Sequence, residues 1–270
     1  MTPNSLPSGA TPSTTATPAV GTARLLVSKV PEVTAVFWIT KVLTTGMGET
    51  TSDYLAHTLD PAVAVCLGGL GFAAALVLQF TVKRYIPWVY WLAVAMVSVF
   101  GTMAADVLHV GLGIPYLVST IFYAVVLAAV FLIWRRVEGT LSIHSIHTRR
   151  REAFYWLAVL ATFALGTAAG DLTAVTFNLG YLGSGVLFAI AIAVPALAYW
   201  KLGLKAIPAF WGAYIITRPL GASFADWMAV SHARGGLDWG TGPVSMGWAL
   251  AIAAFVAVLA IRQRTTPAVA

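Results

Sequence analysis

The sequence has few of the residues that soluble domains use for charge or cross-linking. Charged residues make up only 10% of its 270 residues, and Cys66 is its single cysteine. One cysteine excludes an internal disulfide and any CxxC metal or redox motif. By contrast, 59% of the residues are hydrophobic and the mean hydropathy is +0.83, far above the values of soluble domains. The chain is therefore predicted to be an integral membrane protein that is surrounded by a lipid bilayer.

The two ends of the chain differ from this apolar body. Residues 1–28 are rich in Thr, Pro, Ser and Ala, and they contain no apolar run behind a basic start. Such a segment is typical of a disordered cytosolic tail rather than a signal peptide. We expect a single transmembrane domain over 29–264 and a short tail over 265–270.

Eight apolar runs are long enough to cross a membrane as helices. A hydrocarbon core about 30 Å thick needs roughly 20 mostly apolar residues per helix, and charge, Gly or Pro separates one run from the next. We expect an all-α polytopic protein with eight transmembrane helices, at about 33–55, 61–82, 88–108, 116–134, 153–174, 184–200, 209–229 and 243–261.

Basic residues are distributed unequally between the two sides of this predicted bundle. Only Arg234 falls on the side opposite the termini, while Lys41 and Arg218 fall inside spans. The remaining 13 of the 16 basic residues share the side of both termini: Arg24, Lys29, Lys83, Arg84, Arg135, Arg136, Arg149, Arg150, Arg151, Lys201, Lys205, Arg262 and Arg264. The positive-inside rule then places both termini in the cytoplasm. The net charge of +6 thus reflects topology, and no nucleic-acid partner is expected.

Four segments of the chain align without a gap. They are WITKVLTTGMGETTSD (38–53), WLAVAMVSVFGTMAAD (91–106), WLAVLATFALGTAAGD (156–171) and WGAYIITRPLGASFAD (211–226). In each, Gly lies ten residues after Trp, and Asp lies fifteen residues after it. Self-similarity at a fixed spacing predicts four tandem repeats of a helix pair, at about 33–82, 88–134, 153–200 and 209–261.

The recurring Trp and Gly residues have simple structural interpretations. Indole rings prefer the membrane interface, so we expect helix anchors at Trp38, Trp91, Trp156 and Trp211. Small residues let helix backbones approach closely in lipid, so we expect close packing at Gly48, Gly101, Gly166 and Gly221.

The recurring acids are harder to explain structurally. Fifteen residues raise each Asp about 22 Å above its Trp, and a carboxylate in lipid is costly unless it faces a polar interior. We therefore expect a shared layer that binds cations or protons, made of Asp53, Asp106, Asp171 and Asp226, with Glu49 adding charge. Lys41 and Arg218 are expected to be internal counter-ions that pair with acids of other helices.

Four histidines are possible metal ligands: His57, His109, His144 and His147. The first two follow an Asp by four and three residues and would share its helical face. Mixed carboxylate and imidazole ligands suit Mn²⁺, Zn²⁺ or Fe²⁺. The last two form an HxxH in a basic loop, where a gate or regulatory metal site competes with a purely topological role.

This organisation resembles a family of bacterial multi-pass membrane proteins built from four tandem two-helix repeats that each carry a Trp. The resemblance covers residues 30 to about 262, and the four aligned segments together with SIHSIHTRRREAFYW (142–156) support it. It implies the repeat architecture and the inner (plasma) membrane of a bacterium, and it leaves the function to the residues.

The predicted function is transport of a cation, with a divalent metal ion exchanged for protons through a central acidic cavity. The metal would be a substrate, so no cofactor and no catalytic residue is expected. One alternative is a transporter of a small anion held by Lys41 and Arg218. A membrane scaffold and a metal-dependent intramembrane hydrolase are further alternatives, although HExxH and GxSxG motifs are lacking. A homo-oligomer is possible, and the repeats could form a ring or two pairs.

Overall fold

The computed structural model describes residues 28–265. The two predicted tails lie outside these residues, except that Ser28 and Thr265 at their inner ends are described. Ser28, the first described residue, is buried.

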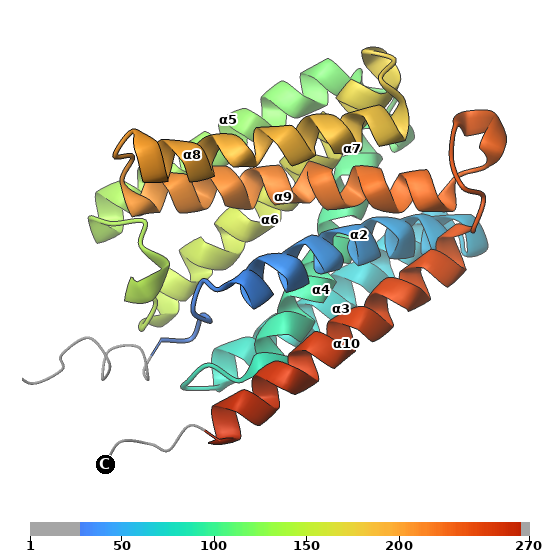
Figure 1. Ribbon diagram of the computed structural model, residues 1–270. Helices are drawn as coiled ribbons and strands as arrows, with labels where there is room; N and C mark the ends of the chain where they lie inside the picture. The colour runs from blue at the N-terminus through green and yellow to red at the C-terminus, as the bar shows by residue number, and fades with distance from the viewer. Residues whose placement is uncertain (1–27, 266–270) are drawn as a thin grey trace, which may run out of the picture.

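Nine α-helices make up most of the described chain (Figure 1). They are α2 (Ala35–Thr58), α3 (Pro61–Thr81), α4 (Pro87–Asp106), α5 (Tyr116–Glu138), α6 (Arg149–Asp171), α7 (Gly180–Ala191), α8 (Ala193–Lys201), α9 (Ala206–Ala229) and α10 (Thr241–Thr265). Short π-helical segments, η1 (Val107–Gly111) and η3 (Leu172–Thr176), extend α4 and α6, and α7 continues into α8. The 3₁₀ turns η2 (Ile143–Ser145) and η4 (His232–Arg234) lie in loops.

Six helical segments of the described chain are long and apolar enough to cross a membrane. They are Pro61–Thr81, Pro87–Gly111, Tyr116–Glu138, Arg149–Thr176, Gly180–Lys201 and Thr241–Gln263. The two other long helices, α2 and α9, contain 24 residues each but are not among the six. Both carry the ionisable side chains of the repeats, including Lys41 and Glu49 in α2 and Arg218 in α9. The structure is thus an all-α, multi-pass architecture with six apolar candidate spans.

Local sequence signals fix several of the helix ends. The hydroxyl of Thr34 accepts a hydrogen bond from the backbone N–H of Phe37 and caps α2. Asp60 caps α3 in the same way, and Pro61 follows at the first helical position, where its missing N–H costs nothing. Gly139 ends α5 with a φ of 74°, a left-handed conformation that glycine adopts without strain.

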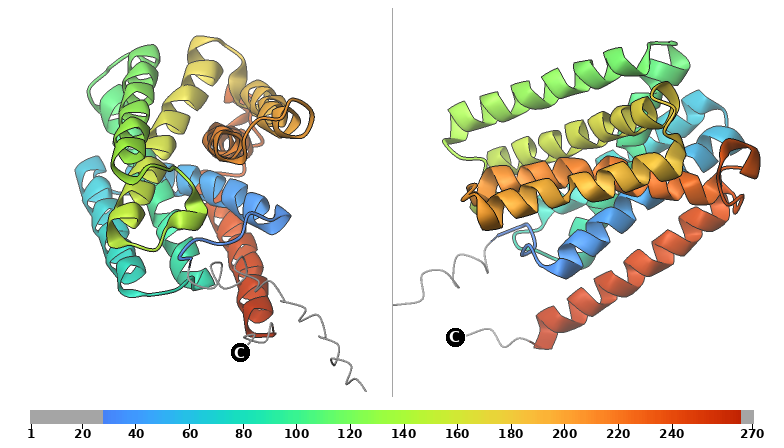
Figure 2. Two further views of the ribbon diagram at one scale, coloured as in Figure 1. Left: turned by 90° about the vertical axis from the view of Figure 1, so that its left-hand side faces the viewer. Right: turned by 45° about the horizontal axis from the view of Figure 1, so that its top comes forward.

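The four Trp-bearing helices form a closed inner ring. Helix α2 packs against α4 and α9, and α6 packs against the same two helices from the opposite side. The other helices form an outer layer: α3 packs mainly on α4, α5 on α6, α7 and α8 on α9, and α10 on α2. Each repeat therefore covers the inner helix of the next repeat, and the fourth covers that of the first. Figure 2 shows this bundle from one end and from above.

The conserved spacing of glycine within the repeats explains how the ring closes. A Cβ on each glycine would collide with the residue seven positions after the Trp of the following repeat. The contacts are Gly48 with Ser98, Gly101 with Phe163, Gly166 with Arg218, and Gly221 with Thr45. All four would lie within 2.6 Å of the partner side chain, too close for any residue but glycine unless the helices moved apart. The four glycines thus set the spacing of the ring.

The repeat tryptophans mostly lie inside the protein rather than at its surface. Trp91, Trp156 and Trp211 are at most 4% exposed and belong to the main hydrophobic core, while Trp38 is half-buried. The indole N–H of Trp211 donates to the carbonyl of Leu141 at 3.0 Å. An interfacial anchor must expose its ring to the headgroups, so the expected anchoring role does not fit these three. Trp91 and Trp156 pack against aromatic rings of the inner helices, and Trp211 packs against Phe131 and Trp134 of α5.

A buried ion pair ties the start of the described chain to two helices at this same end. Lys29 Nζ lies 2.6 Å from Oε2 of Glu152, whose other oxygen accepts a 2.9 Å hydrogen bond from Gln79. Glu152 is 1% exposed, and its two partners satisfy both carboxylate oxygens. We call this side of the bundle the Trp end and the opposite side, where the inner helices finish, the Asp end.

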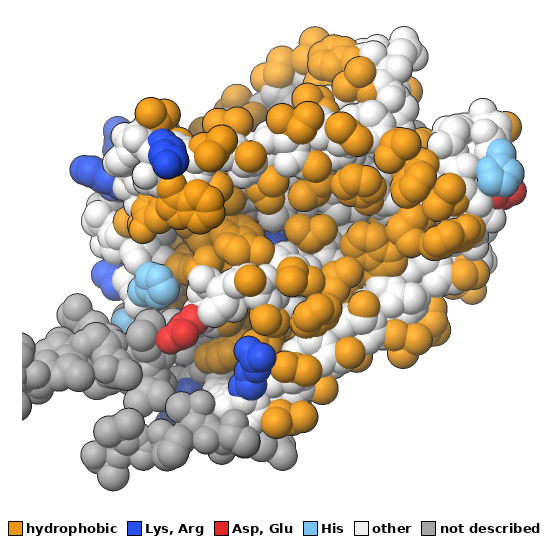
Figure 3. All heavy atoms as spheres, in the orientation of Figure 1, with side chains coloured by type: hydrophobic (Ala, Val, Ile, Leu, Met, Phe, Trp, Pro, Cys, Tyr) orange, Lys and Arg blue, Asp and Glu red, His pale blue; other side chains and the backbone are white. Residues whose placement is uncertain are grey.

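The two ends also differ in the charges of their loops. Loops and helix ends at the Trp end carry most of the basic residues, among them Lys83, Arg84, Arg149, Lys201 and Lys205. The space-filling view shows hydrophobic side chains over the middle of the visible face, with Lys and Arg gathered toward one side (Figure 3). An apolar belt between polar ends is the surface expected of a protein embedded in lipid.

Candidate cation site

Residues at every fourth position of the inner helices form successive levels inside the ring. Counted from the Trp, the levels fall at positions 3, 7, 11 and 15, which share one helical face. The levels are Lys41, Val94, Val159 and Tyr214; then Thr45, Ser98, Phe163 and Arg218; then Glu49, Thr102, Thr167 and Ala222; and last Asp53, Asp106, Asp171 and Asp226. All residues of the first three levels are buried. Polarity thus rises from the Trp end to the Asp end.

The levels nearest the Trp end are closed by packed side chains. Nζ of Lys41 lies 4.1 Å from the ring centroid of Phe163 and 4.4 Å from that of Tyr214. Since α2 and α6 lie on opposite sides of the ring, the contact with Phe163 crosses its middle. Aromatic faces attract an ammonium group, and this nitrogen has no hydrogen-bond partner within the described chain. Side chains of α2, α6 and α9 thus meet across the ring at this level.

Arg218 fills the next part of the interior. Its terminal nitrogen Nη2 forms an ion pair with Oε2 of Glu49 and donates to the hydroxyls of Thr102 and Thr167, the latter at 2.6 Å. The guanidinium of α9 therefore contacts side chains of the other three inner helices, α2, α4 and α6. Arg218 is fully buried, and the ion pair joins the fourth repeat to the first across helices. Arg218 is thus paired with a protein carboxylate, whereas Lys41 contacts aromatic rings and forms no ion pair within the described chain.

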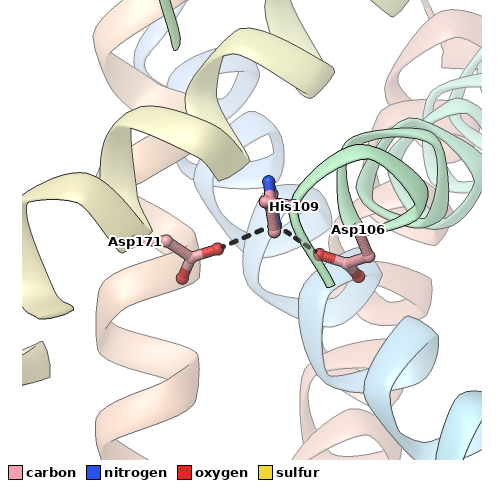
Figure 4. A group of neighbouring side chains, drawn as sticks. All are labelled: Asp106, His109 and Asp171. Carbon is pink, nitrogen blue, oxygen red and sulfur yellow. Dashed lines mark hydrogen bonds and ion pairs between the residues drawn. The ribbon is translucent and has the colours of Figure 1, made fainter. Parts of the chain in front are cut away.

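A cluster of three potential metal ligands lies at the Asp end. Nε2 of His109 lies 3.0 Å from Oδ1 of Asp106 and 3.3 Å from Oδ2 of Asp171 (Figure 4). One donor atom from each residue falls within 4.8 Å of the others, and this is the only such group of three found in residues 28–265. The imidazole is 1% exposed, whereas the two carboxylates are 29% and 19% exposed. The cluster therefore lies at a partly open mouth.

Both helices that supply this cluster change from α-helix to π-helix directly after the Asp. The segment η1 begins one residue after Asp106 and contains His109, and η3 begins one residue after Asp171. A π-turn widens the helix and redirects the side chains, and such turns occur frequently at functional sites. His109, within the π-helical segment η1, lies against its own Asp and against the Asp of the neighbouring repeat. The ring of His109 also packs on Tyr116, with centroids 4.8 Å apart.

The other two repeat acids lie near the cluster but are not part of it. Asp226 is 7% exposed, and its Oδ1 has no hydrogen-bond partner among the described residues. Asp53 is half-buried. Each lies within electrostatic range of Glu49 and Asp171. The four repeat acids are thus linked electrostatically at the Asp end of the ring.

The remaining histidines do not join a cluster of ligands. His57 is exposed, and its Nδ1 lies 2.6 Å from the backbone carbonyl oxygen of Asp53. His144 and His147 are exposed at the Trp end, far along the bundle from the acid layer. Of the four histidines predicted as possible ligands, the described structure brings only His109 together with other donors.

Sequence reasoning missed the two threonines that hold Arg218. Thr102 and Thr167 occupy the same repeat position as Glu49, and this correspondence was visible in the alignment. Threonine, however, is common in membrane helices as a donor to its own helix, so the position alone did not single them out. Only the position of the Arg218 side chain, which reaches both threonines from α9, shows that they contribute to a site.

The fold and site define a class of protein: a multi-pass α-helical membrane protein made of four tandem helix pairs, with a polar core and an acidic mouth. The chain belongs to the family described as Repeat of Unknown Function (DUF347), which matches it at residues 36–85, 89–140, 154–203 and 209–265. The four matched units coincide with the helix pairs, so the predicted repeats are confirmed. No curated protein and no solved structure matches the chain.

Proposed function

We propose that this protein transports cations across a membrane and that it exchanges a divalent metal ion for protons. The observation that carries the proposal is the group of donor atoms from Asp106, His109 and Asp171, gathered within 4.8 Å on two inner helices at the mouth of the ring. Two carboxylates and an imidazole are ligands that suit Mn²⁺, Zn²⁺ or Fe²⁺. Polar groups of this kind are costly in lipid and mark ion pathways.

In this proposal each residue of the cluster has a definite role. The two carboxylates supply charge, and Nε2 of His109 supplies a softer ligand. Binding a metal requires these groups to lose their protons, so metal uptake and proton release are coupled. Asp53 and Asp226, in the same layer, would hold further protons or water ligands of the ion.

We further propose that all eight long segments cross the membrane and that the Trp end faces the cytoplasm. The outer faces of α2 and α9 are covered by α10 and by α7 with α8. Neighbouring protein thus replaces lipid around these two helices, and a less apolar sequence can then still span the bilayer. The basic loops at the Trp end support a cytoplasmic location. A bacterial inner membrane fits this arrangement.

Flux measurements with purified protein in liposomes test the transport proposal. A fluorophore that Mn²⁺ or Zn²⁺ quenches is enclosed, and influx is followed with and without an opposing proton gradient. We expect flux that depends on the gradient and that falls about tenfold or more in Asp171→Asn. The matched control is Asp238→Asn, an exposed position with a φ of 58° that Asn accommodates. Absence of flux for every divalent ion, or full flux in Asp171→Asn, would refute the proposal.

Cysteine labelling tests the eight-span topology. In a Cys66→Ser background, Leu202→Cys and Ala233→Cys introduce exposed thiols on the two sides of α9. A maleimide that cannot cross the membrane should label only one of them in sealed vesicles. Glu32→Cys and Leu59→Cys apply the same comparison to α2. If both cysteines of a pair are labelled from the same side, the helix between them does not cross the membrane.

A further inference from the structure

The nitrogen Nη2 of Arg218 lies in a cradle of three oxygens from three different helices. These are Oε2 of Glu49, Oγ1 of Thr102 and Oγ1 of Thr167. The oxygens occupy the same repeat position, so the pseudo-fourfold ring itself creates the cradle. At the fourth corner stands Ala222, which offers no oxygen and leaves room for the arginine of its own helix. Every residue of the cradle is at most 5% exposed.

The cradle presents more acceptors than an arginine nitrogen can use. A terminal guanidinium nitrogen carries two N–H groups, yet this one faces three oxygens. The hydroxyl of Thr102 has two acceptors within reach, the carbonyl of Ser98 at 3.1 Å and Oε2 of Glu49 at 3.3 Å, and that of Thr167 donates to the carbonyl of Phe163 at 3.3 Å. Because each hydroxyl proton has an acceptor, the lone pairs of both hydroxyl oxygens are free to face the centre of the cradle. Several lone pairs around one centre form the environment of a bound cation.

The cradle also lies where an ion that moves inward from the acid layer would pass. Its level lies four residues, or about 6 Å of helix rise, below the acid layer. Glu49 is within electrostatic range of Asp106 and Asp171 in the metal cluster. On the other side, the cradle borders Phe163 and Lys41, which close the ring. An ion that leaves the cluster and moves inward reaches this level next.

We propose that the Glu49–Thr102–Thr167 cradle is a second cation site, and that the guanidinium of Arg218 occupies it in this conformation as a tethered substitute for the ion. Arg218 then acts as an internal gate: the transported ion enters the cradle only when the arginine leaves it. This inference rests on the proposed transport function and adds a buried site of one carboxylate and two hydroxyls. Such a site, with oxygen ligands only, favours hard cations such as Mn²⁺ over Zn²⁺.

Counting bound Mn²⁺ by electron paramagnetic resonance tests the second site. Wild type should bind about one Mn²⁺ per chain, at the Asp106–His109–Asp171 cluster. Arg218→Gln should bind about two, because the cradle becomes free and its acid loses its partner. The double variant Arg218→Gln with Glu49→Gln should return to about one. An Arg218→Gln protein that keeps its helical circular dichroism but gains no Mn²⁺ would overturn the inference.

The same titration separates this inference from the proposed function. If wild type binds no Mn²⁺ but Arg218→Gln gains a Glu49-dependent ion, the proposed site at the mouth is refuted and the proposed cradle site is supported. If wild type binds one ion and Arg218→Gln remains at one, the cradle fails and the mouth cluster stands.

A second variant covers the case in which Arg218→Gln does not fold. Glu49→Gln is nearly isosteric and keeps an oxygen for Arg218, so it should fold with reduced stability and should still bind one Mn²⁺ at the mouth. Its flux in liposomes should fall about tenfold or more, because the uncharged cradle no longer attracts the ion. Wild-type flux in Glu49→Gln would show that ions bypass the cradle.

Discussion

Gly221 lies so close to Thr45 that a Cβ on the glycine would come 1.9 Å from the threonine hydroxyl oxygen. The two residues belong to the fourth and first repeats, at opposite ends of the transmembrane sequence. The same glycine also faces the backbone carbonyl of Val42, at 2.6 Å from the added atom. Since backbone cannot rotate away as a side chain can, this contact closes the ring and fixes its diameter.

Gly221→Ala should therefore destabilise the protein. Overpacking of a tight contact costs about 1–3 kcal/mol, and we expect a lower thermal unfolding midpoint in detergent. The control is Gly247→Ala in α10, where an added Cβ meets nothing within 4 Å. Equal unfolding midpoints of Gly221→Ala and wild type would mean that the ring is looser than the structure shows.

His109→Asn should change the selectivity of cation binding. Loss of the imidazole removes the ligand that transition metals prefer, so the affinity for Zn²⁺ should fall about tenfold or more. Affinity for Mg²⁺, which depends on the carboxylates, should change little. Isothermal titration of both ions measures the effect. His57→Asn is the matched control, because its ring contacts only its own helix among the interactions found in the structure; an equal loss in both variants would argue against the cluster.

Cation binding should weaken as the pH falls. Protons compete with a metal for carboxylates and imidazole, so lowering the pH shifts these ligands toward forms that cannot bind. We expect the apparent affinity for Mn²⁺ to decrease from about pH 8 to about pH 5, because proton competition grows as the pH falls. Calorimetry in buffers of different ionisation enthalpy should also detect protons released on binding. Affinity that is constant over this range, without proton release, would contradict exchange of metal for protons.

Glu152→Gln should destabilise the Trp end. The change leaves the ammonium of Lys29 buried without its carboxylate partner, and breaking a buried pair typically costs about 3 kcal/mol or more. Thermal unfolding measures the loss, with Glu32→Gln as a control at an exposed glutamate. Adding Lys29→Met to Glu152→Gln should recover part of the stability, since it removes the unpaired charge. A double variant no more stable than Glu152→Gln would show that the charge pair is not the cause.

Much of the architecture can be predicted from the sequence because the repeat is visible as recurring residues. The recurrence of Trp, Gly and Asp at fixed spacing predicted the helix pairs, and the family match confirms them. It also placed the four acids at one level, since helix rise converts equal spacing into equal height. The chemical asymmetry between repeats, with Lys41, Glu49 and Arg218 replacing neutral residues, was likewise readable from the aligned segments.

Other features depended on which helix faces which neighbour, and only the tertiary structure decided them. The tryptophans were expected at the interface, but three of them are buried against aromatic side chains from other helices. The site at the mouth joins His109 to Asp171 of the next repeat, a contact that depends on how two inner helices pack. Arg218 reaches Thr102 only because the four inner helices pack as a ring, with both side chains directed to its interior. The sequence alone determines periodicity along a helix, whereas contacts between distant residues arise from packing, which couples all the helices at once.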